Sequence, residues 1–348
     1  KRIMNKSLYD ISWQVTEEEY RADSAYSYST IARYEREGFS KLDKLFEKID
    51  TPSLVFGSMV DTLLTDGEEA FNDRFAVMDL PDVSDKVMTI IKGLWNLFHD
   101  KYRKLELIDK EIISQACVSH DYYVDSKWKS LRVKNVLEGA EYYTLLFLAE
   151  DKTIVSSKDY EDAAGCVRAL KEDRVTGKYF AANNPFDNID RQYQLKFKGE
   201  FEGIGLRCMA DLIIIDYDNK IIIPVDLKTS SKPEYDFYKS FIDWSYYIQA
   251  SLYHYIMKQN LEKDPFFKDF VLKDYRFIVV NRYRKCPLLW EYPLTQAITD
   301  LKFGELNNIK CRNWRTIVKE LDYYLKNKPI NPIGIKDINN IVEWLNKI

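Results

Sequence analysis

The sequence predicts an α/β (α+β) fold in which a central mixed β-sheet is flanked by helices. Residues 212–215 and 221–225 are two apolar runs separated by a short polar turn, the pattern of a buried hairpin. Residues 277–281 and 288–294 are two further strand-like runs. Between these pairs, residues 235–260 repeat apolar and aromatic side chains at helical spacing. A helix between strands that extend one sheet indicates the α/β class.

We expect one domain spanning residues 1–348, made of four consecutive segments. The N-terminal segment, 1–75, is predicted to be helical, most clearly at 40–46 and 54–64. A largely helical insertion, 80–185, follows and includes helices at 87–98 and 160–171. The core, 190–260, holds the strands and a helix at 245–260. The last segment, 270–348, adds strands and helices at 295–301, 313–326 and 335–348, with a break at 329–332.

The polar turn between the two apolar runs fixes which side chains meet. If Asp218 and Asn219 form a two-residue loop, Asp211 lies directly opposite Asp226, with Cβ atoms about 5 Å apart. Lys228 lies two residues further along and shares the face of Asp226. Pro224 cannot donate a ladder hydrogen bond, and a bulge at this residue would shift the pairing by one.

Two carboxylates held opposite each other repel unless a cation lies between them. A divalent ion satisfies this requirement, and two Asp carboxylates with water suit Mg²⁺. Lys228 can then orient the attacking water or neutralise charge that develops on a phosphate. The alternative is an exposed hairpin with solvated acids, which the apolar flanking runs disfavour.

The helix that follows carries Gln249 and Tyr253 on one face, because they are four residues apart. With Asp211 and the Asp226-Leu-Lys228 triplet, this Gln-x-x-x-Tyr pattern resembles the PD-(D/E)XK nucleases. The similarity is to their exonuclease branch, which includes phage lambda-type, RecE-type and RecB-type enzymes. It implies a restriction-endonuclease-like core in which Asp211 and Asp226 bind metal, Lys228 is catalytic, and Gln249 and Tyr253 support the site or the DNA end.

Two upstream segments extend the resemblance to residues 26–34, an opening helix, and 57–64, which is similar to the family's Gly-x-x-x-His helix. Asp61 stands where many relatives have a metal-binding histidine. It is either a further ligand for a hard ion or an ordinary polar helix residue. With a loop at Glu202 and Gly203, Gln194 faces Asp211 where the family tends to have glutamate. That neutral amide makes reduced or lost cleavage an open alternative.

The resemblance implies a metal-dependent exodeoxyribonuclease, a phosphodiesterase that uses Mg²⁺ or Mn²⁺ and acts 5′→3′ on double-stranded DNA ends in phage or mobile-element recombination. Two alternatives remain: a catalytically silent DNA-binding or scaffold protein with the nuclease fold, and a structure-specific endonuclease. The expected partners are DNA, a single-strand annealing protein and further copies of this chain. The expected location is the cytoplasm of a bacterial host.

Charge and cysteine usage agree with this interpretation. The formal net charge is −4, from 51 Lys+Arg and 55 Asp+Glu, so DNA binding needs local basic stretches. The candidates are 127–134, the set Arg191, Lys196, Lys198 and Arg207, and 282–285. Five scattered cysteines without CxxC spacing argue against a disulfide framework, a zinc site and an iron–sulfur cluster. No apolar run approaches the roughly 20 residues of a membrane span.

Overall fold

The computed structural model describes residues 6–47, 51–184, 187–294, 304–306 and 309–327. The chain divides into two compact units, the first made of residues 1–52 and 168–348 and the second of residues 53–167. Each has its own hydrophobic core. The expectation of one domain with a helical insertion at 80–185 stays a prediction.

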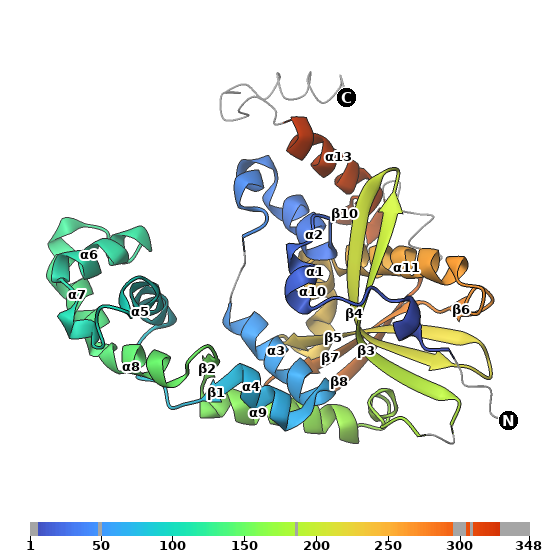
Figure 1. Ribbon diagram of the computed structural model, residues 1–348, viewed down its shortest axis with the longest axis horizontal. Coiled ribbons are helices and arrows are strands. Elements are labelled where there is room, and N and C mark those ends of the chain that lie inside the picture. Colours follow the sequence, from blue (N-terminus) through green and yellow to red (C-terminus); the bar gives the residue numbers. More distant parts are fainter. Residues whose placement is uncertain (1–5, 48–50, 185–186, 295–303, 307–308, 328–348) are drawn as a thin grey trace. The chain divides into compact units, whose positions relative to one another are not determined.

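The first unit is built on the expected mixed sheet, in the order β3-β4-β5-β7-β8 (Figure 1). β3, β4 and β5 run antiparallel, β5 and β7 run parallel, and β8 returns antiparallel to β7. The short strand β6 pairs with β5 in parallel. The strand bounds are β3 Ile189–Phe201, β4 Ile204–Asp216, β5 Ile221–Ser230, β6 Val271–Leu272, β7 Tyr275–Asn281 and β8 Pro287–Tyr292. A separate hairpin joins β9 Gly304–Leu306 to β10 Ile309–Cys311.

Helix α11 packs on β3, β4 and β7, and α13 packs on α2 and α11. The resulting core joins Ile213 and Phe277 of the sheet to Leu252 of α11 and Trp314 of α13. The α-helices of this unit are α1 Glu17–Ala22, α2 Tyr28–Glu37, α10 Phe237–Asp243, α11 Tyr246–Lys263 and α13 Trp314–Asn327. Its 3-10 helices are η1 Leu8–Ile11, η2 Phe39–Lys44, η5 Gly177–Tyr179 and η6 Glu234–Asp236.

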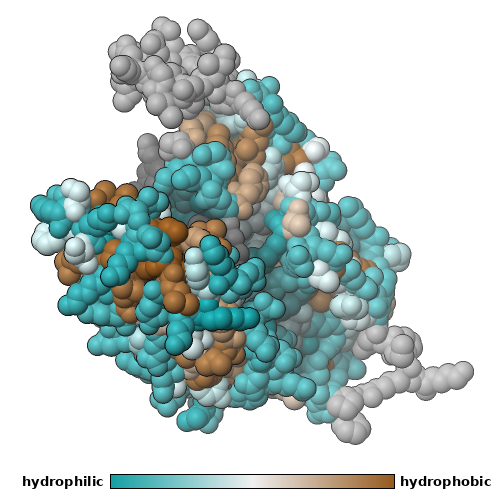
Figure 2. All heavy atoms as spheres, turned by 60° about the vertical axis from the view of Figure 1, so that its left-hand side comes forward, coloured by the Kyte–Doolittle hydropathy of each residue, from teal (hydrophilic) through white to brown (hydrophobic). Residues whose placement is uncertain are grey.

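The second unit is mainly helical, with a two-stranded parallel sheet of β1 Phe75–Val77 and β2 Thr153–Val155. Its helices are α3 Pro52–Thr65, α4 Gly67–Arg74, α5 Asp85–Phe98, η3 Leu105–Leu107, α6 Lys110–Ser119, η4 Ser126–Trp128, α7 Lys129–Glu138, α8 Ala140–Leu148 and α9 Ser157–Glu172, which continues into the first unit. Apolar side chains remain exposed on this unit, including Leu97, Leu107 and Leu148. Figure 2 shows hydrophobic residues, in brown, among the hydrophilic ones at the surface of the chain.

Several local predictions need correction. The helix expected at 40–46 is the 3-10 helix η2, and the periodic stretch 235–260 is broken at Ser245, whose φ of +57° separates α10 from α11. The turn between β4 and β5 has four residues outside the ladder, 217–220, instead of two. Because one extra residue leaves the ladder on each side, the register is unchanged. The helices expected at 295–301 and 335–348 lie outside the described residues.

Candidate active site

The strand register brings the predicted acids to neighbouring positions. Leu212 pairs with Val225, and Ile213 pairs with Pro224, so the proline causes no shift in the pairing. Asp211 and Asp226 are the next residues on the two strands, and the predicted register is confirmed up to them. Beyond this point β5 continues along β7.

The carboxylate of Asp211 connects β4 and β5 at the end of their hydrogen-bonded ladder. Its Oδ2 accepts a hydrogen bond from the backbone N–H of Leu227 at 2.9 Å. A side-chain oxygen thus satisfies a β5 donor, as buried or half-buried backbone groups require. The contact fixes the Asp211 carboxylate beside the Asp226-Leu-Lys228 triplet.

Asp226 is buried, with 1% of its surface exposed. Its Oδ2 lies 2.6 Å from Lys228 Nζ, and its Oδ1 accepts a hydrogen bond from Gln249 Nε2 at 2.5 Å. A buried carboxylate needs such partners, because an unpaired charge in a protein interior is costly. Lys228 on β5 and the side-chain amide of Gln249 on α11 therefore hold Asp226 in one orientation.

Lys228 is charged in this arrangement. Burial disfavours the ammonium form, but the nearby Asp226, Tyr246 and Asp211 outweigh burial and raise the pKa of Lys228 above its ordinary value. A lysine with a raised pKa is a poor general base near neutral pH. Lys228 is therefore suited to stabilising negative charge, one of the two roles that the sequence suggested.

Tyr253 lies in the buried layer beneath the acids. Its ring packs edge-on against both Tyr28 of α2 and Tyr275 of β7, with centroid distances of 6.5 and 6.3 Å. Burial raises the pKa of the Tyr253 phenol, and Asp226 and Asp211 raise it further, so the hydroxyl stays neutral. This packing places Gln249, one helical turn earlier, against Asp226.

The sequence reasoning did not single out Tyr246, Tyr28 or Tyr275 as site residues. Lys228 Nζ lies 4.8 Å from the centroid of the Tyr246 ring, and Tyr28 lies 6.3 Å from the same ring. Tyr246 precedes Gln249 by three residues, so helical spacing on the Gln-x-x-x-Tyr face was a usable signal. No local signal connects Tyr28 or Tyr275 with the acids.

Gln194 behaves differently from an ordinary strand residue. Tyr193 pairs with Leu212 and Leu195 with Ala210, which confirms the predicted register on both sides of Gln194. Gln194 itself has a φ of +54° and drops out of the ladder opposite Asp211. Left-handed backbone is unfavourable for a residue with a Cβ, so this position departs from regular strand geometry. Its role toward a metal stays a prediction.

Asp61 lies on α3, in the second unit. Whether it binds metal with Asp211 and Asp226 stays a prediction. In the part of the chain that the structure describes, no three His, Cys, Asp or Glu side chains are grouped as a ready metal cage.

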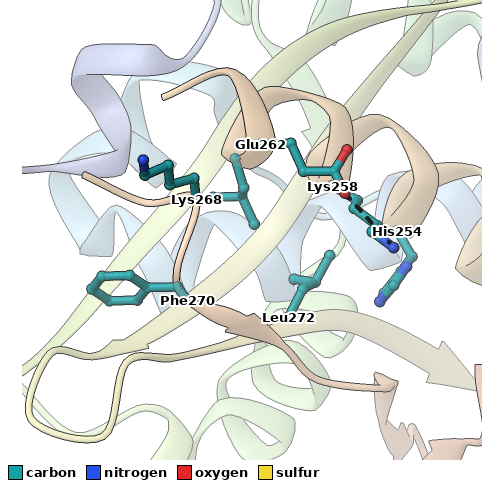
Figure 3. Close-up of a pocket in the computed structure, with 7 residues that line it drawn as sticks. His254, Lys258, Glu262, Lys268, Phe270 and Leu272 are labelled. Atoms are coloured by element: carbon teal, nitrogen blue, oxygen red, sulfur yellow. Dashed lines mark ion pairs between the residues drawn. The ribbon is translucent and has the colours of Figure 1, made fainter. Parts of the chain in front are cut away.

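His254 contacts a pocket of about 240 Å³ lined by α11 and by the segment that leads into β6 (Figure 3). The ion pair between Lys258 and Glu262 lies in the same pocket. Burial lowers the pKa of His254, and Lys258 lowers it further, so the imidazole is neutral. His254 belongs to this pocket and makes no contact with the acids among those described.

The basic residues proposed to bind DNA differ in whether they already pair with other parts of the chain. Lys198 pairs with Asp23, while Arg207, Arg191 and Lys196 donate to backbone carbonyls, so this set mainly supports the fold. The stretch 282–285 directly follows β7, the strand that pairs with β5 at Lys228.

No described helix has the length and apolar character needed to cross a bilayer.

A mixed sheet with an acid on one strand, Asp-x-Lys on the next and a Gln-x-x-x-Tyr helix packed against the sheet defines the core of the PD-(D/E)XK nuclease superfamily. The chain belongs to this superfamily, and within it to the family described as "PDDEXK-like domain of unknown function (DUF3799)", whose model matches residues 24–273. A comparison with curated proteins gave no match.

One similar solved structure, from Eubacterium rectale, is described as a "Putative exonuclease". It shares 15% sequence identity with this chain, with a TM-score of 0.46, over 92% of this chain and 89% of that one. The family match confirms the resemblance to the PD-(D/E)XK nucleases drawn from the sequence motifs. Membership of the exonuclease branch stays a prediction.

Proposed function

We propose that this protein is a metal-dependent DNA nuclease that degrades DNA from its ends. The observation that carries the proposal is the buried Asp226 carboxylate, fixed by Lys228 and Gln249, with Asp211 tied to the same strand. A bound divalent cation and a positive charge near the phosphate both accelerate phosphodiester hydrolysis, and these residues supply the means for both.

The donor set fits a hard divalent ion. Asp211 and Asp226 offer carboxylate oxygens from adjacent strands, and Mg²⁺ usually takes one or two carboxylates and keeps several waters. Two further oxygens, Gln249 Oε1 and Tyr275 Oη, are buried and have no hydrogen-bond partner among the described residues. Burial raises the pKa of Tyr275, and the charges of Asp226 and Asp211 raise it further, which indicates that its hydroxyl is near the acids. Such atoms are normally satisfied by ordered water, which a hydrated ion would bring.

When bound, Mg²⁺ or Mn²⁺ would polarise a phosphate oxygen and lower the pKa of a bound water. Asp211 and Asp226 would hold the ion. The Lys228 ammonium would stabilise negative charge on the phosphate, because it is charged and lies beside Asp226. Gln249 would keep Asp226 in its orientation, and Tyr253 would keep α11 against the sheet.

Digestion from ends, 5′→3′ polarity, a role in phage or mobile-element recombination, a single-strand annealing partner and self-association all rest on the resemblance to the exonuclease branch. Cleavage of closed DNA would instead favour the structure-specific endonuclease. These alternatives make different products from the same substrates, which allows one assay to separate them.

We expect the purified protein to degrade linear double-stranded DNA with Mg²⁺ or Mn²⁺, and to lose this activity in EDTA, because the chelator removes the ion that would polarise the phosphate and activate the attacking water. The assay compares linear and covalently closed circular DNA of the same sequence by gel electrophoresis. Nicking of the circle would support the endonuclease. Intact linear DNA with both metals would contradict the nuclease proposal and support a silent DNA-binding protein.

The silent alternative is favoured by one observation, the neutral Gln194 in the chain position where relatives tend to have glutamate. If Gln194 takes that position at the metal, the ion has one anionic ligand fewer and its affinity is low. We then expect Gln194→Glu to sustain cleavage at about tenfold lower Mg²⁺ concentration, since one added carboxylate contact worth about 1.4 kcal/mol changes affinity tenfold. A titration of the cleavage rate with Mg²⁺ measures the shift.

Asp61→Asn tests the remaining ligand in the same titration. If Asp61 compensates for the missing glutamate, this variant needs more Mg²⁺ than the wild type. An unchanged Mg²⁺ dependence would show that Asp61 is an ordinary polar residue of α3. A Gln194→Glu variant with an unshifted Mg²⁺ dependence would remove Gln194 from the site.

A further inference from the structure

Trp244 and Arg36 form an exposed cation–aromatic pair. Trp244 stands between α10 and α11 with 50% of its surface exposed. Arg36 lies in the last turn of α2 and is also exposed. The guanidinium carbon Cζ of Arg36 is 5.0 Å from the centroid of the indole ring. Both residues belong to the unit that holds the acidic site.

A series of contacts leads from this pair to Lys228. The Tyr28 hydroxyl donates a hydrogen bond to the Trp244 carbonyl oxygen at 2.5 Å. The Tyr28 ring lies 6.3 Å from the Tyr246 ring, which is 4.8 Å from Lys228 Nζ. Burial raises the pKa values of Tyr28 and Tyr246, and the charge of Arg36 opposes this rise at both phenols. Arg36 therefore lies within electrostatic range of the groups that surround Lys228.

The Arg36 charge is not used by its helix neighbours. Glu35 pairs with Arg312 at 2.7 Å, and Glu37 pairs with Arg33 at 3.2 Å. Among the described residues, no carboxylate forms an ion pair with Arg36. A guanidinium in this state can take a phosphate through two parallel hydrogen bonds. The exposed part of the indole offers area on which a base can stack.

We infer that Trp244 and Arg36 bind one unpaired nucleotide at the end of the DNA substrate, with the base stacked on the indole and a phosphate held by the guanidinium. This inference rests on the proposed nuclease function and specifies its substrate as an end that carries a single-stranded overhang. A base inside a duplex is already stacked on both sides, so an aromatic side chain can take only an unpaired one.

The test measures binding of a fluorescently labelled duplex by anisotropy in EDTA, with either a short single-stranded overhang or a blunt end. Trp244→Ala is expected to weaken binding of the overhang duplex about tenfold, within the range found for loss of one base–aromatic stack. Binding of the blunt duplex should stay near its wild-type value. Trp244→Phe should retain most of the overhang preference, because it keeps an aromatic face.

Arg36 is tested through the salt dependence of the same binding. Arg36→Gln should reduce the slope of log K against log salt by about 0.7 to 0.9, the amount expected for one lost phosphate contact, whereas Arg36→Lys should keep the slope. The matched control is Trp128→Ala, which removes an indole of 42% exposure that has Lys127 at 5.4 Å from its ring. This control should preserve the difference between overhang and blunt DNA.

Unchanged overhang binding by folded Trp244→Ala, or an equal loss on overhang and blunt DNA, would overturn the inference. If Trp244→Ala does not fold, the Arg36→Gln slope decides, and an unchanged slope refutes the site. Because binding is measured without metal, its outcome is separate from cleavage. A wild type that cleaves no DNA while Trp244→Ala loses overhang binding would refute the nuclease function and leave the nucleotide site standing.

Discussion

Asp226→Asn is expected to slow cleavage of linear DNA by at least about 10²–10³-fold, the size of effect seen when one group that stabilises the transition state is removed. The substitution keeps the shape of the side chain but removes the charge that would hold the ion. Metal binding should weaken in parallel, which calorimetric titration with Mn²⁺ measures. Asp211→Asn should act in the same direction, because both acids are proposed ligands.

Lys228→Ala separates the two proposed roles. It should slow cleavage by a similar factor while metal binding is retained, because the ammonium is proposed to act on the phosphate and not on the ion. Asp218→Asn is the matched control: this acid is exposed in the β4–β5 turn and contacts Asn188. Wild-type cleavage by Asp226→Asn would refute the metal-site assignment, and loss of metal binding in Lys228→Ala would refute the division of roles.

Asp226→Ala is expected to lower the free energy of unfolding by about 3–5 kcal/mol, because it leaves the Lys228 ammonium without its carboxylate partner. Only 19% of the Lys228 side chain is exposed, so water compensates the charge poorly. The double variant Asp226→Ala/Lys228→Met removes both charges and should be more stable than Asp226→Ala alone. Urea denaturation in EDTA measures both values and excludes any contribution from bound metal.

The ion pair of Lys232 and Asp243 provides the comparison, because it is exposed to solvent. Lys232 Nζ lies 3.1 Å from Asp243 Oδ2, and 39% of the lysine side chain and 61% of the aspartate side chain are exposed. Asp243→Ala should change the unfolding free energy by less than about 1 kcal/mol. If the double variant at Asp226 and Lys228 is no more stable than Asp226→Ala, the unpaired Lys228 ammonium is not the cause of the lower unfolding free energy.

The pH of this measurement follows from the direction of the Lys228 shift. The pKa of Lys228 in the folded chain is raised above its ordinary value of 10.5. The stabilisation from its charge is therefore fully present below about pH 10.5 and is lost as the pH rises through the folded pKa. A measurement near pH 7.5 thus records the whole contribution of the pair.

Local patterns in the sequence determined the part of the fold that holds the acids. Two short turns set the registers of β3 with β4 and of β4 with β5, and both hold in the structure even though one turn is longer than expected. That Asp226 and Lys228 share a strand face followed from their spacing of two, whereas the ion pair between them is seen only in the structure. The Gln249 and Tyr253 face followed from helical periodicity in the same way.

Contacts between distant parts of the chain decided the rest. The sequence could not show that Gln249 donates to Asp226, that Tyr28 reaches the carbonyl of Trp244, or that Gln194 leaves its ladder at φ +54°. Residues close in sequence have few possible arrangements, because turn and helix geometry restrict them. Residues separated by long stretches of chain meet only when α2, α11 and the sheet pack together, and packing depends on the shapes of many side chains at once.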